Sequence, residues 1–177
     1  EVAVIMQNGM HRMLDLQEDV FYYITVMNEN YVHPAMPAGA EAGIVRGMYR
    51  LRSGARKKLH VQLMGSGTIL REVIAAAEML EKDFQVSSDV WSVTSFTELR
   101  RDGIDCDRWN MLHPAEQPRQ SCVAQSLAGQ PGPCIAATDY MRIVADQIRQ
   151  WVPGRYVVLG TDGYGRSDSR AALRDFF

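Results

Sequence analysis

Two glycine-containing loops are the parts of this sequence that could bind an anion. LGTDGYGRSDSR occupies residues 159–170, where a strand-like run ends and a helix-like pattern begins, and MGSG occupies 64–67 in the same kind of place. Glycines at such a junction let backbone N–H groups approach a phosphate at the N-terminus of a helix. These loops are therefore the first candidates for a ligand site.

The neighbouring residue types favour ordinary turns over a phosphate site. Asp168 stands where the dinucleotide-binding fingerprint has its third Gly or Ala, and a carboxylate there would repel a phosphate. Ser167 or Asp168 is better explained as the N-cap of the last helix. A small-anion site formed by Gly65–Thr68 and Thr161–Gly165 is the alternative that the residues leave open.

The remaining chemistry-bearing residues lack the partners that a reaction would need. His113 has only Glu116 near it, so the ligand set of a metal site is incomplete. No serine occupies a G-x-S-x-G elbow, which leaves a hydrolase triad without its nucleophile. The cysteines Cys106, Cys122 and Cys134 form no C-x-x-C pair, and their odd number indicates reduced thiols. We therefore assign no catalytic, cofactor-binding or metal-binding residue from these patterns.

The composition limits the class of protein. A length of 177 residues with 46% hydrophobic content is enough for one full-sized domain with a buried core. A net charge of −2 and a pI near 6.1 argue against nucleic-acid and polybasic membrane partners. No apolar run approaches the length of about 20 residues that a membrane span requires. We expect a cytoplasmic protein.

From residue 59 onward, short apolar runs alternate with amphipathic stretches, as strands alternate with helices. We predict strands in HVQLMG (60–65), SDVWSVTSF (88–96), GPCIAATDY (132–140) and RYVVLG (155–160), and helices over 69–84 and 141–152. Because parallel neighbours need crossover connections, this order predicts an α/β fold with a mostly parallel sheet flanked by helices. Ligands bind such sheets beyond the carboxyl ends of the strands, which singles out residues 65–68, 94–98 and 161–169.

Hydroxyl and carboxylate residues mark where these helices begin. The predicted caps are Ser66 or Thr68 for helix 69–84, Ser95 with Glu98 as a capping box, and Thr138 or Asp139 for helix 141–152.

The first 58 residues have a different character. A helix is predicted at the start, with Ile5, Met6, Gly9, Met10 and Met13 at helical spacing. The β-branched and aromatic run Val20–Met27 predicts a strand buried on both faces. Prolines, glycines and basic residues over 31–58 are typical of a linker between domains. Since the chain begins and ends inside apolar-periodic segments, we expect it to be a piece of a longer polypeptide.

Several long motifs carry a family resemblance. SVTSFTELRRDG, DRWNMLHP, TDYMRIVADQIRQWVPG, LGTDGYGRSDSR and NENYVHPAMPAGAEAGI resemble the C-terminal part of the homodimeric-type pyruvate dehydrogenase component. Transketolase is a more distant relative, with a G-x-D-x-[FY]-G-x-S pattern that matches Gly160, Asp162, Tyr164, Gly165 and Ser167. The resemblance runs from one end of the chain to the other.

This resemblance implies a domain organisation. Residues 1–30 would be the C-terminal end of a pyrimidine-binding domain, 31–57 an interdomain linker, and 58–177 a three-layer transketolase-like C-terminal domain that is incomplete at its C-terminus. The tail end of a second α/β domain would thus precede the main sheet.

The resemblance also implies a function for the parent enzyme. It would be a bacterial, cytoplasmic oxidoreductase that uses thiamine diphosphate and Mg²⁺ to decarboxylate pyruvate, and that acetylates the lipoyl group of dihydrolipoyl acetyltransferase. Its second partner would be another copy of its own subunit. The family's G-D-G cofactor motif, its pyrimidine-pairing glutamate and its substrate histidines have no match here, so the resemblance implies a structural, dimer-supporting segment that binds no cofactor alone. The alternative is a free-standing flavodoxin-like module with the small-anion site described above.

Overall fold

The computed structural model describes residues 1–27 and 30–176. Asn28 and Glu29 of the NENY motif, and Phe177, lie outside the described residues. The elements in chain order are α1 (Val2–Met10), a π-helical turn (His11–Asp15), α2 (Glu41–Arg46), β1 (Met48–Arg52), β2 (His60–Gly65), α3 (Ile69–Phe84), β3 (Ser87–Val93), α4 (Phe96–Leu112), α5 (Cys122–Leu127), β4 (Cys134–Met141), α6 (Arg142–Asp146), a 3₁₀ turn (Arg149–Trp151), β5 (Tyr156–Thr161) and α7 (Arg170–Phe176).

The strands form a single five-stranded sheet in the order β1-β3-β2-β4-β5. β3, β2, β4 and β5 are parallel, and the edge strand β1 runs antiparallel to β3. The predicted mostly parallel α/β sheet is confirmed. The antiparallel β1 separates this sheet from an all-parallel flavodoxin-like one.

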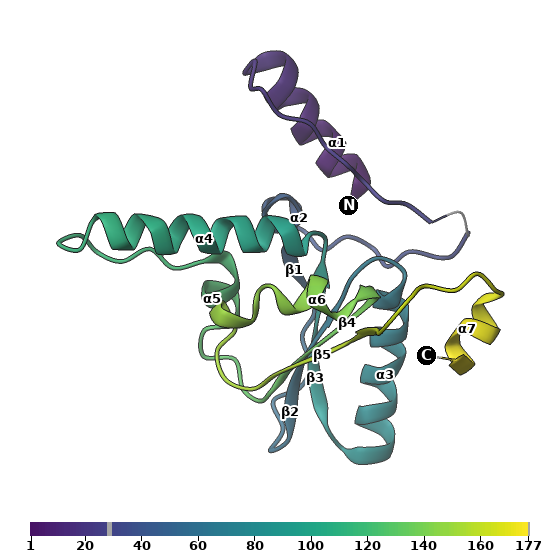
Figure 1. Ribbon diagram of the computed structural model, residues 1–177. Helices are drawn as coiled ribbons and strands as arrows, with labels where there is room; N and C mark the ends of the chain where they lie inside the picture. The colour runs from purple at the N-terminus through teal and green to yellow at the C-terminus, as the bar shows by residue number, and fades with distance from the viewer. Residues whose placement is uncertain (28–29, 177) are drawn as a thin grey trace.

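Helices cover both faces of the sheet, which gives three layers (Figure 1). α3 packs on one face through the apolar stripe predicted for it, with Leu70, Val73 and Ala77 buried against Leu63 and Val90. The other face carries α4, α5 and α6. Its larger core includes Met64, Trp91, Phe96, Leu99, Val123, Ala136, Ala145, Ile148, Tyr156 and Val158. Adjacent residues of each strand thus serve opposite cores, as a sheet buried on both faces requires.

The run Val20–Met27, expected to be a buried strand, contains no strand, and that prediction is wrong. Phe21 is 90% exposed and Tyr23 is 89% exposed. A strand is stabilised by hydrogen bonds to a neighbouring strand, and within the described residues no strand lies against this run. The apolar residue types indicate burial, but they do not determine which part of the protein covers them.

The stretch 31–57, expected to be a linker, is partly folded into the domain. Glu41–Arg46 form α2, and Met48–Arg52 form β1, which is hydrogen-bonded to β3. α1 is attached here as well, because Val4 and Ile5 pack against the small core of Ala40, Ile44 and Tyr49. The sheet therefore begins at about residue 48, ahead of the expected boundary at 58.

The predicted helix caps are correct at one site and wrong at others. Ser95 caps α4, its Oγ accepting from the N–H of Glu98 at 3.1 Å. The reciprocal half of the capping box is absent, because the Glu98 carboxylate pairs with Arg101. Thr68 is the N-cap residue of α3 but forms no side-chain cap bond there.

The last two helices start elsewhere than expected. β4 continues to Met141, so α6 starts at Arg142, and neither Thr138 nor Asp139 caps it. At α7 it is Ser169, not Ser167 or Asp168, whose hydroxyl accepts a first-turn N–H, from Ala172 at 3.3 Å.

None of the helices in residues 1–27 and 30–176 is both long and apolar enough to cross a membrane.

Candidate functional site

The carboxyl ends of β2 and β4 form the switch point of the sheet, because the chain continues to β3 on one side and leads from β4 to β5 on the other. The expected loop 65–68 lies here. Its Ser66 N–H donates to the Ala137 carbonyl at 3.3 Å, and its hydroxyl donates to the Thr138 hydroxyl at 3.0 Å. Both side chains are buried, so their hydroxyls are engaged with each other within the protein.

The N-terminus of α3 offers few donors to an anion. The N–H groups of Ile69, Leu70 and Arg71 donate to the carbonyls of Ser66, Gly67 and Thr68 respectively, at 3.2 to 3.3 Å. Helix N-termini bind anions through N–H groups that lack such partners. This geometry is that of a tight strand-to-helix turn.

The two glycines of this loop have structural explanations. A Cβ on Gly65 would lie 2.7 Å from the Cα of Leu70, so glycine is required for α3 to pack closely. Gly67 has φ of +55°, in the left-handed region that favours glycine.

The loop 161–169 lies at the same edge but does not join the first loop in one site. β4 lies between β2 and β5, so the two loops are about two strand spacings, or about 10 Å, apart. Asp162 is paired with Arg142 at 3.0 Å, and residues 162–169 are exposed. Gly163 has φ of +80°, as a turn requires. The described geometry therefore gives the small-anion alternative no support.

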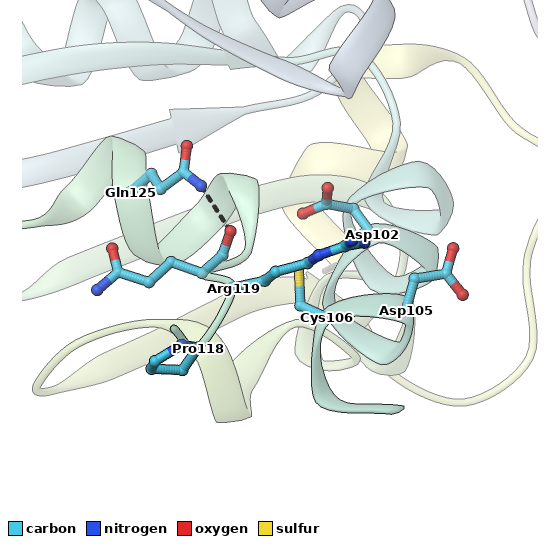
Figure 2. Close-up of a pocket in the computed structure, with 7 residues that line it drawn as sticks. Asp102, Asp105, Cys106, Pro118, Arg119 and Gln125 are labelled. Carbon is cyan, nitrogen blue, oxygen red and sulfur yellow. Dashed lines mark hydrogen bonds between the residues drawn. The ribbon is translucent and has the colours of Figure 1, made fainter. Parts of the chain in front are cut away.

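An open cleft of about 580 Å³ lies between α4, the segment that follows it and α5 (Figure 2). Its lining residues are Asp102, Asp105, Cys106, Pro118, Arg119, Gln120 and Gln125. The carboxylate of Asp102 already accepts from the N–H of Cys122 at the start of α5, and Gln125 donates to the carbonyl of Gln120. Asp102 and Gln125 thus fix the path of the chain around α5.

The cysteines are not poised as nucleophiles. Burial raises the pKa of the Cys106 thiol, and the nearby Asp102 carboxylate raises it further. Burial also raises the pKa of Cys122, and it raises that of Cys134 to about 11. Nucleophilic cysteines have depressed pKa values, and the shift of all three thiols is in the opposite direction. All three are free cysteines in the structure.

His113 is a structural residue at the end of α4. Its ring stacks on Trp109, with centroids 4.4 Å apart, and its Nδ1 lies 2.8 Å from the Trp109 carbonyl. In the part of the chain that the structure describes, no three His, Cys, Asp or Glu residues are grouped to hold a metal ion.

A buried polar cluster at the opposite, amino edge of the sheet was not found by sequence reasoning. His60, the first residue of β2, has Nε2 at 3.1 Å from Asp89 Oδ2 and Nδ1 at 2.7 Å from Ser87 Oγ. Gln62 Nε2 donates to the same Asp89 oxygen at 3.1 Å, and its Oε1 accepts from the indole of Trp91 at 2.9 Å. These five residues form four pairs whose members are 27 to 29 residues apart in sequence, and they meet because β2 and β3 are paired in parallel.

This cluster has the residue types of a hydrolytic triad but not its access. Ser87 and Asp89 have no exposed surface, and His60 is 5% exposed. A nucleophile must reach its substrate, so Ser87 has no such role. The cluster instead connects two strands with two loops: the N–H of Gly54 donates to Asp89 at 3.0 Å, and Gln62 donates to the carbonyl of Pro131 at 3.1 Å.

Comparison with known proteins places this fold. Residues 47–177 match the family model described as the transketolase-like TK C-terminal domain. The chain belongs to this family. Residues 1–34 match a second model, the pyruvate dehydrogenase E1 component middle domain.

Curated relatives named pyruvate dehydrogenase E1 component match the chain along its whole length. The identity over 179 residues is 61% with the protein of Pseudomonas aeruginosa, 62% with that of Cupriavidus necator and 59% with that of Escherichia coli. Each match covers 100% of this chain and 20% of the relative. The chain therefore spans about a fifth of the length of these relatives, and the resemblance inferred from its motifs is confirmed.

The residues of the transketolase-type pattern lie together at one edge of the sheet. The family-pattern residues Gly160, Asp162 and Tyr164 lie at the end of β5 and just beyond it. A Cβ on Gly160 would lie 2.8 Å from the Tyr140 carbonyl, so this glycine serves the contact between β5 and β4. Gly160 of the pattern thus has a structural role at the sheet edge.

Proposed function

We propose that this chain is the C-terminal part of a pyruvate dehydrogenase E1 component and that it supports the assembly of the enzyme without supplying catalytic residues. The observation that carries the proposal is the 61% identity with the Pseudomonas aeruginosa E1 component over the whole chain. An identity of 61% that extends over 100% of this chain favours the same role in a parent protein of the same kind.

The parent reaction in this proposal is the oxidative decarboxylation of pyruvate, followed by acetylation of a lipoyl group on dihydrolipoyl acetyltransferase. Thiamine diphosphate, with Mg²⁺, would supply the electron sink for loss of carbon dioxide. The enzyme would act as a homodimer in the bacterial cytoplasm.

The residues of the described chain do not fit the diphosphate or its metal. The first N–H groups of α3 are engaged, Asp162 is paired with Arg142, and the described residues hold no cluster of metal-ligating side chains. We therefore assign cofactor binding to the remainder of the parent protein and derive no catalytic step through this chain.

The division into domains follows from the same proposal. Residues 1–34 would belong to the middle domain and the C-terminal domain would begin near residue 47, with a shorter linker than the 31–57 expected from sequence. The pairing of β1 with β3 supports a start near residue 47, since a strand at 48–52 belongs to the sheet that it extends.

A supporting role in the homodimer is favoured by exposed apolar side chains at the carboxyl edge. They gather where β4 and β5 end and α6 begins: Tyr140, Met141, Ile143, Leu159 and Tyr164, which are 44% to 96% exposed. Exposed apolar clusters of this kind are typical of surfaces that other protein covers.

A truncation tests the structural role. The Pseudomonas aeruginosa enzyme without the segment that corresponds to this chain should sediment as a monomer and should not oxidise pyruvate. A truncated protein that remained an active dimer would contradict the proposed role. In parallel, calorimetric titration of the isolated 177-residue chain with thiamine diphosphate and Mg²⁺ should show no binding, and micromolar binding would show that cofactor ligands had been missed.

A further inference from the structure

Two buried hydroxyl groups of the sheet donate to one carboxylate of the N-terminal segment. Glu1 Oε1 accepts from the Tyr49 hydroxyl at 2.8 Å and from the Ser92 hydroxyl. Tyr49 lies on β1 directly opposite Ser92 on β3, so their side chains share one face of the sheet. Tyr49 is 9% exposed and Ser92 is 2% exposed, so both donors are set into the edge of the sheet.

The carboxylate is a strong partner for these hydroxyls. Burial and the hydrogen bond to Glu1 raise the pKa of Tyr49 to about 12, so its hydroxyl keeps its proton and remains a donor at neutral pH. Hydrogen bonds to a charged group are roughly twice as strong as neutral ones. A buried hydroxyl that loses its acceptor is also destabilised, since it has left water without a replacement partner.

The helix that follows Glu1 is held at one end. α1 projects from the three layers, and its N-terminal end is turned toward them (Figure 1). Val4 and Ile5 pack against the small core around Ile44. Met6 and Met10, further along the helix, are about half exposed. Because a helix of nine residues is only marginally stable alone in water, the contacts at its N-terminal end hold α1 in place.

The chain beyond α1 contacts the sheet domain at a second place. Thr25 Oγ1 lies 2.7 Å from the Tyr140 hydroxyl on β4, and the Arg71 guanidinium of α3 lies 4.7 Å from the centroid of the Tyr31 ring. Such exposed contacts are individually weak. β3 and β2 separate β1 from β4, so the two places are about 14 Å apart in the sheet. Two separated points of attachment define an orientation, whereas a single point would leave a pivot.

We propose that Tyr49 and Ser92 form a carboxylate anchor by which the C-terminal domain holds the middle domain of the parent enzyme, with Tyr140 and Arg71 as a second, weaker point of attachment. This rests on the proposed function, in which residues 1–34 belong to the middle domain and the C-terminal domain begins near residue 47. Each of these polar contacts joins the part that matches one family model to the part that matches the other. The anchor orients one domain on the other.

Hydrogen exchange of the α1 amides in the 177-residue chain tests the anchor. Tyr49→Phe removes one donor but keeps the Glu1 charge at the start of α1, where a negative charge by itself favours a helix. The α1 amides should exchange about tenfold faster, the factor expected for a hydrogen bond to a charged group. Tyr23→Phe is the matched control, because Tyr23 is 89% exposed, and it should leave these rates unchanged.

Unchanged α1 exchange in Tyr49→Phe, or an equal increase in Tyr23→Phe, would overturn the proposal. Protected β2 amides establish in each variant that the sheet is folded. Ser92→Ala removes the other donor and should act in the same direction as Tyr49→Phe. It decides the matter if Tyr49→Phe does not fold, and unchanged α1 exchange would then overturn the proposal.

The same measurement in a whole enzyme separates the anchor from the proposed function. In the Pseudomonas aeruginosa E1 component that carries this chain in place of its own segment, Tyr49→Phe should again speed the exchange of α1. Equal α1 exchange with and without Tyr49→Phe in a folded dimer would overturn the role of the anchor in the parent enzyme. An effect of Tyr49→Phe in an exchange protein that does not oxidise pyruvate would support the anchor and count against the proposed function.

Discussion

Replacing Asp89 by alanine is expected to destabilise the domain more than any other single loss of a charge in this chain. Asp89 is fully buried and accepts from the Gly54 N–H, Gln62 and His60 at 3.0 to 3.1 Å. Removing it leaves these donors without their acceptor and leaves the Arg56 guanidinium without its counter-charge. Loss of one partner from a buried pair costs about 3–5 kcal/mol, against a total stability of about 5–15 kcal/mol for a domain.

The effect should depend on pH in a defined direction. Burial alone would raise the pKa of Asp89, but hydrogen bonds from His60, the Gly54 N–H and Gln62 outweigh it and hold the pKa below its usual value. A carboxyl whose pKa is lower in the folded state stabilises the fold above the unfolded pKa of about 3.9, and this contribution is lost as the pH falls through the folded value. The difference between the native chain and Asp89→Ala should thus be full at pH 7 and should shrink below about pH 4.

Urea unfolding followed by tryptophan fluorescence and circular dichroism measures this difference. Trp91 reports on the cluster directly, since its indole donates to Gln62. Glu78→Ala is the matched control, because Glu78 is an exposed carboxylate paired with Arg52, and its loss should change stability by less than about 1 kcal/mol.

A loss below about 1 kcal/mol for Asp89→Ala at pH 7, or one that stayed constant down to pH 3, would show that the ionised Asp89 carboxylate does not stabilise the fold. If the alanine variant does not fold, Asp89→Asn provides the measurement. Its amide oxygen can still accept from the Gly54 N–H, so a smaller loss than in Asp89→Ala is expected, even though its NH₂ group faces the donors of His60 and Gln62. No acid dependence from this residue is expected, because an amide does not titrate.

Three further substitutions test the packing and the turns, each by urea unfolding. Leu99→Ala, at a fully buried position of the larger core, should lower the free energy of unfolding by about 2–5 kcal/mol. Leu112→Ala, at the exposed end of the same helix, should lower it by less than about 1 kcal/mol. Equal effects would contradict the assignment of the buried face of α4. Ser95→Ala should cost about 1 kcal/mol through loss of the bond to the Glu98 N–H, and no measurable loss would mean that this cap does not contribute. Gly65→Ala should cost about 1–3 kcal/mol because its Cβ would overlap Leu70, while Gly165→Ala, which meets no atom within 4 Å, should be nearly neutral; the reverse order would indicate that the 161–169 loop has a contact that the structure lacks.

Local sequence patterns predicted correctly the helices and strands that pack against a core formed by this same chain. α3 and β2 were predicted with their observed bounds, because an apolar stripe of period 3.6 and a short apolar run each face a core made by the same chain. Val20–Met27 has equally strong strand character, yet it lacks a neighbouring strand among the described residues. Residue types indicate the need for burial and not the identity of the covering surface.

β1 and the buried cluster were missed for a different reason. The letters MYRLR alternate as an edge strand does, but the surrounding glycines and basic residues are equally typical of a linker. His60 and Asp89 stand 29 residues apart, and only the parallel register of β2 and β3 brings them together. Each of these two residues alone is compatible with an exposed position, so only the pairing of β2 with β3 reveals the cluster.

Exchange of the C-terminal segment is the most direct test of the proposed identity. In the Pseudomonas aeruginosa E1 component, the segment of 179 aligned residues would be replaced by this chain, and pyruvate oxidation would be measured in the reconstituted complex. We predict a dimer with activity within about tenfold of the parent, which corresponds to about 1.4 kcal/mol in the barrier. A folded, dimeric exchange protein that bound thiamine diphosphate but did not oxidise pyruvate would contradict it.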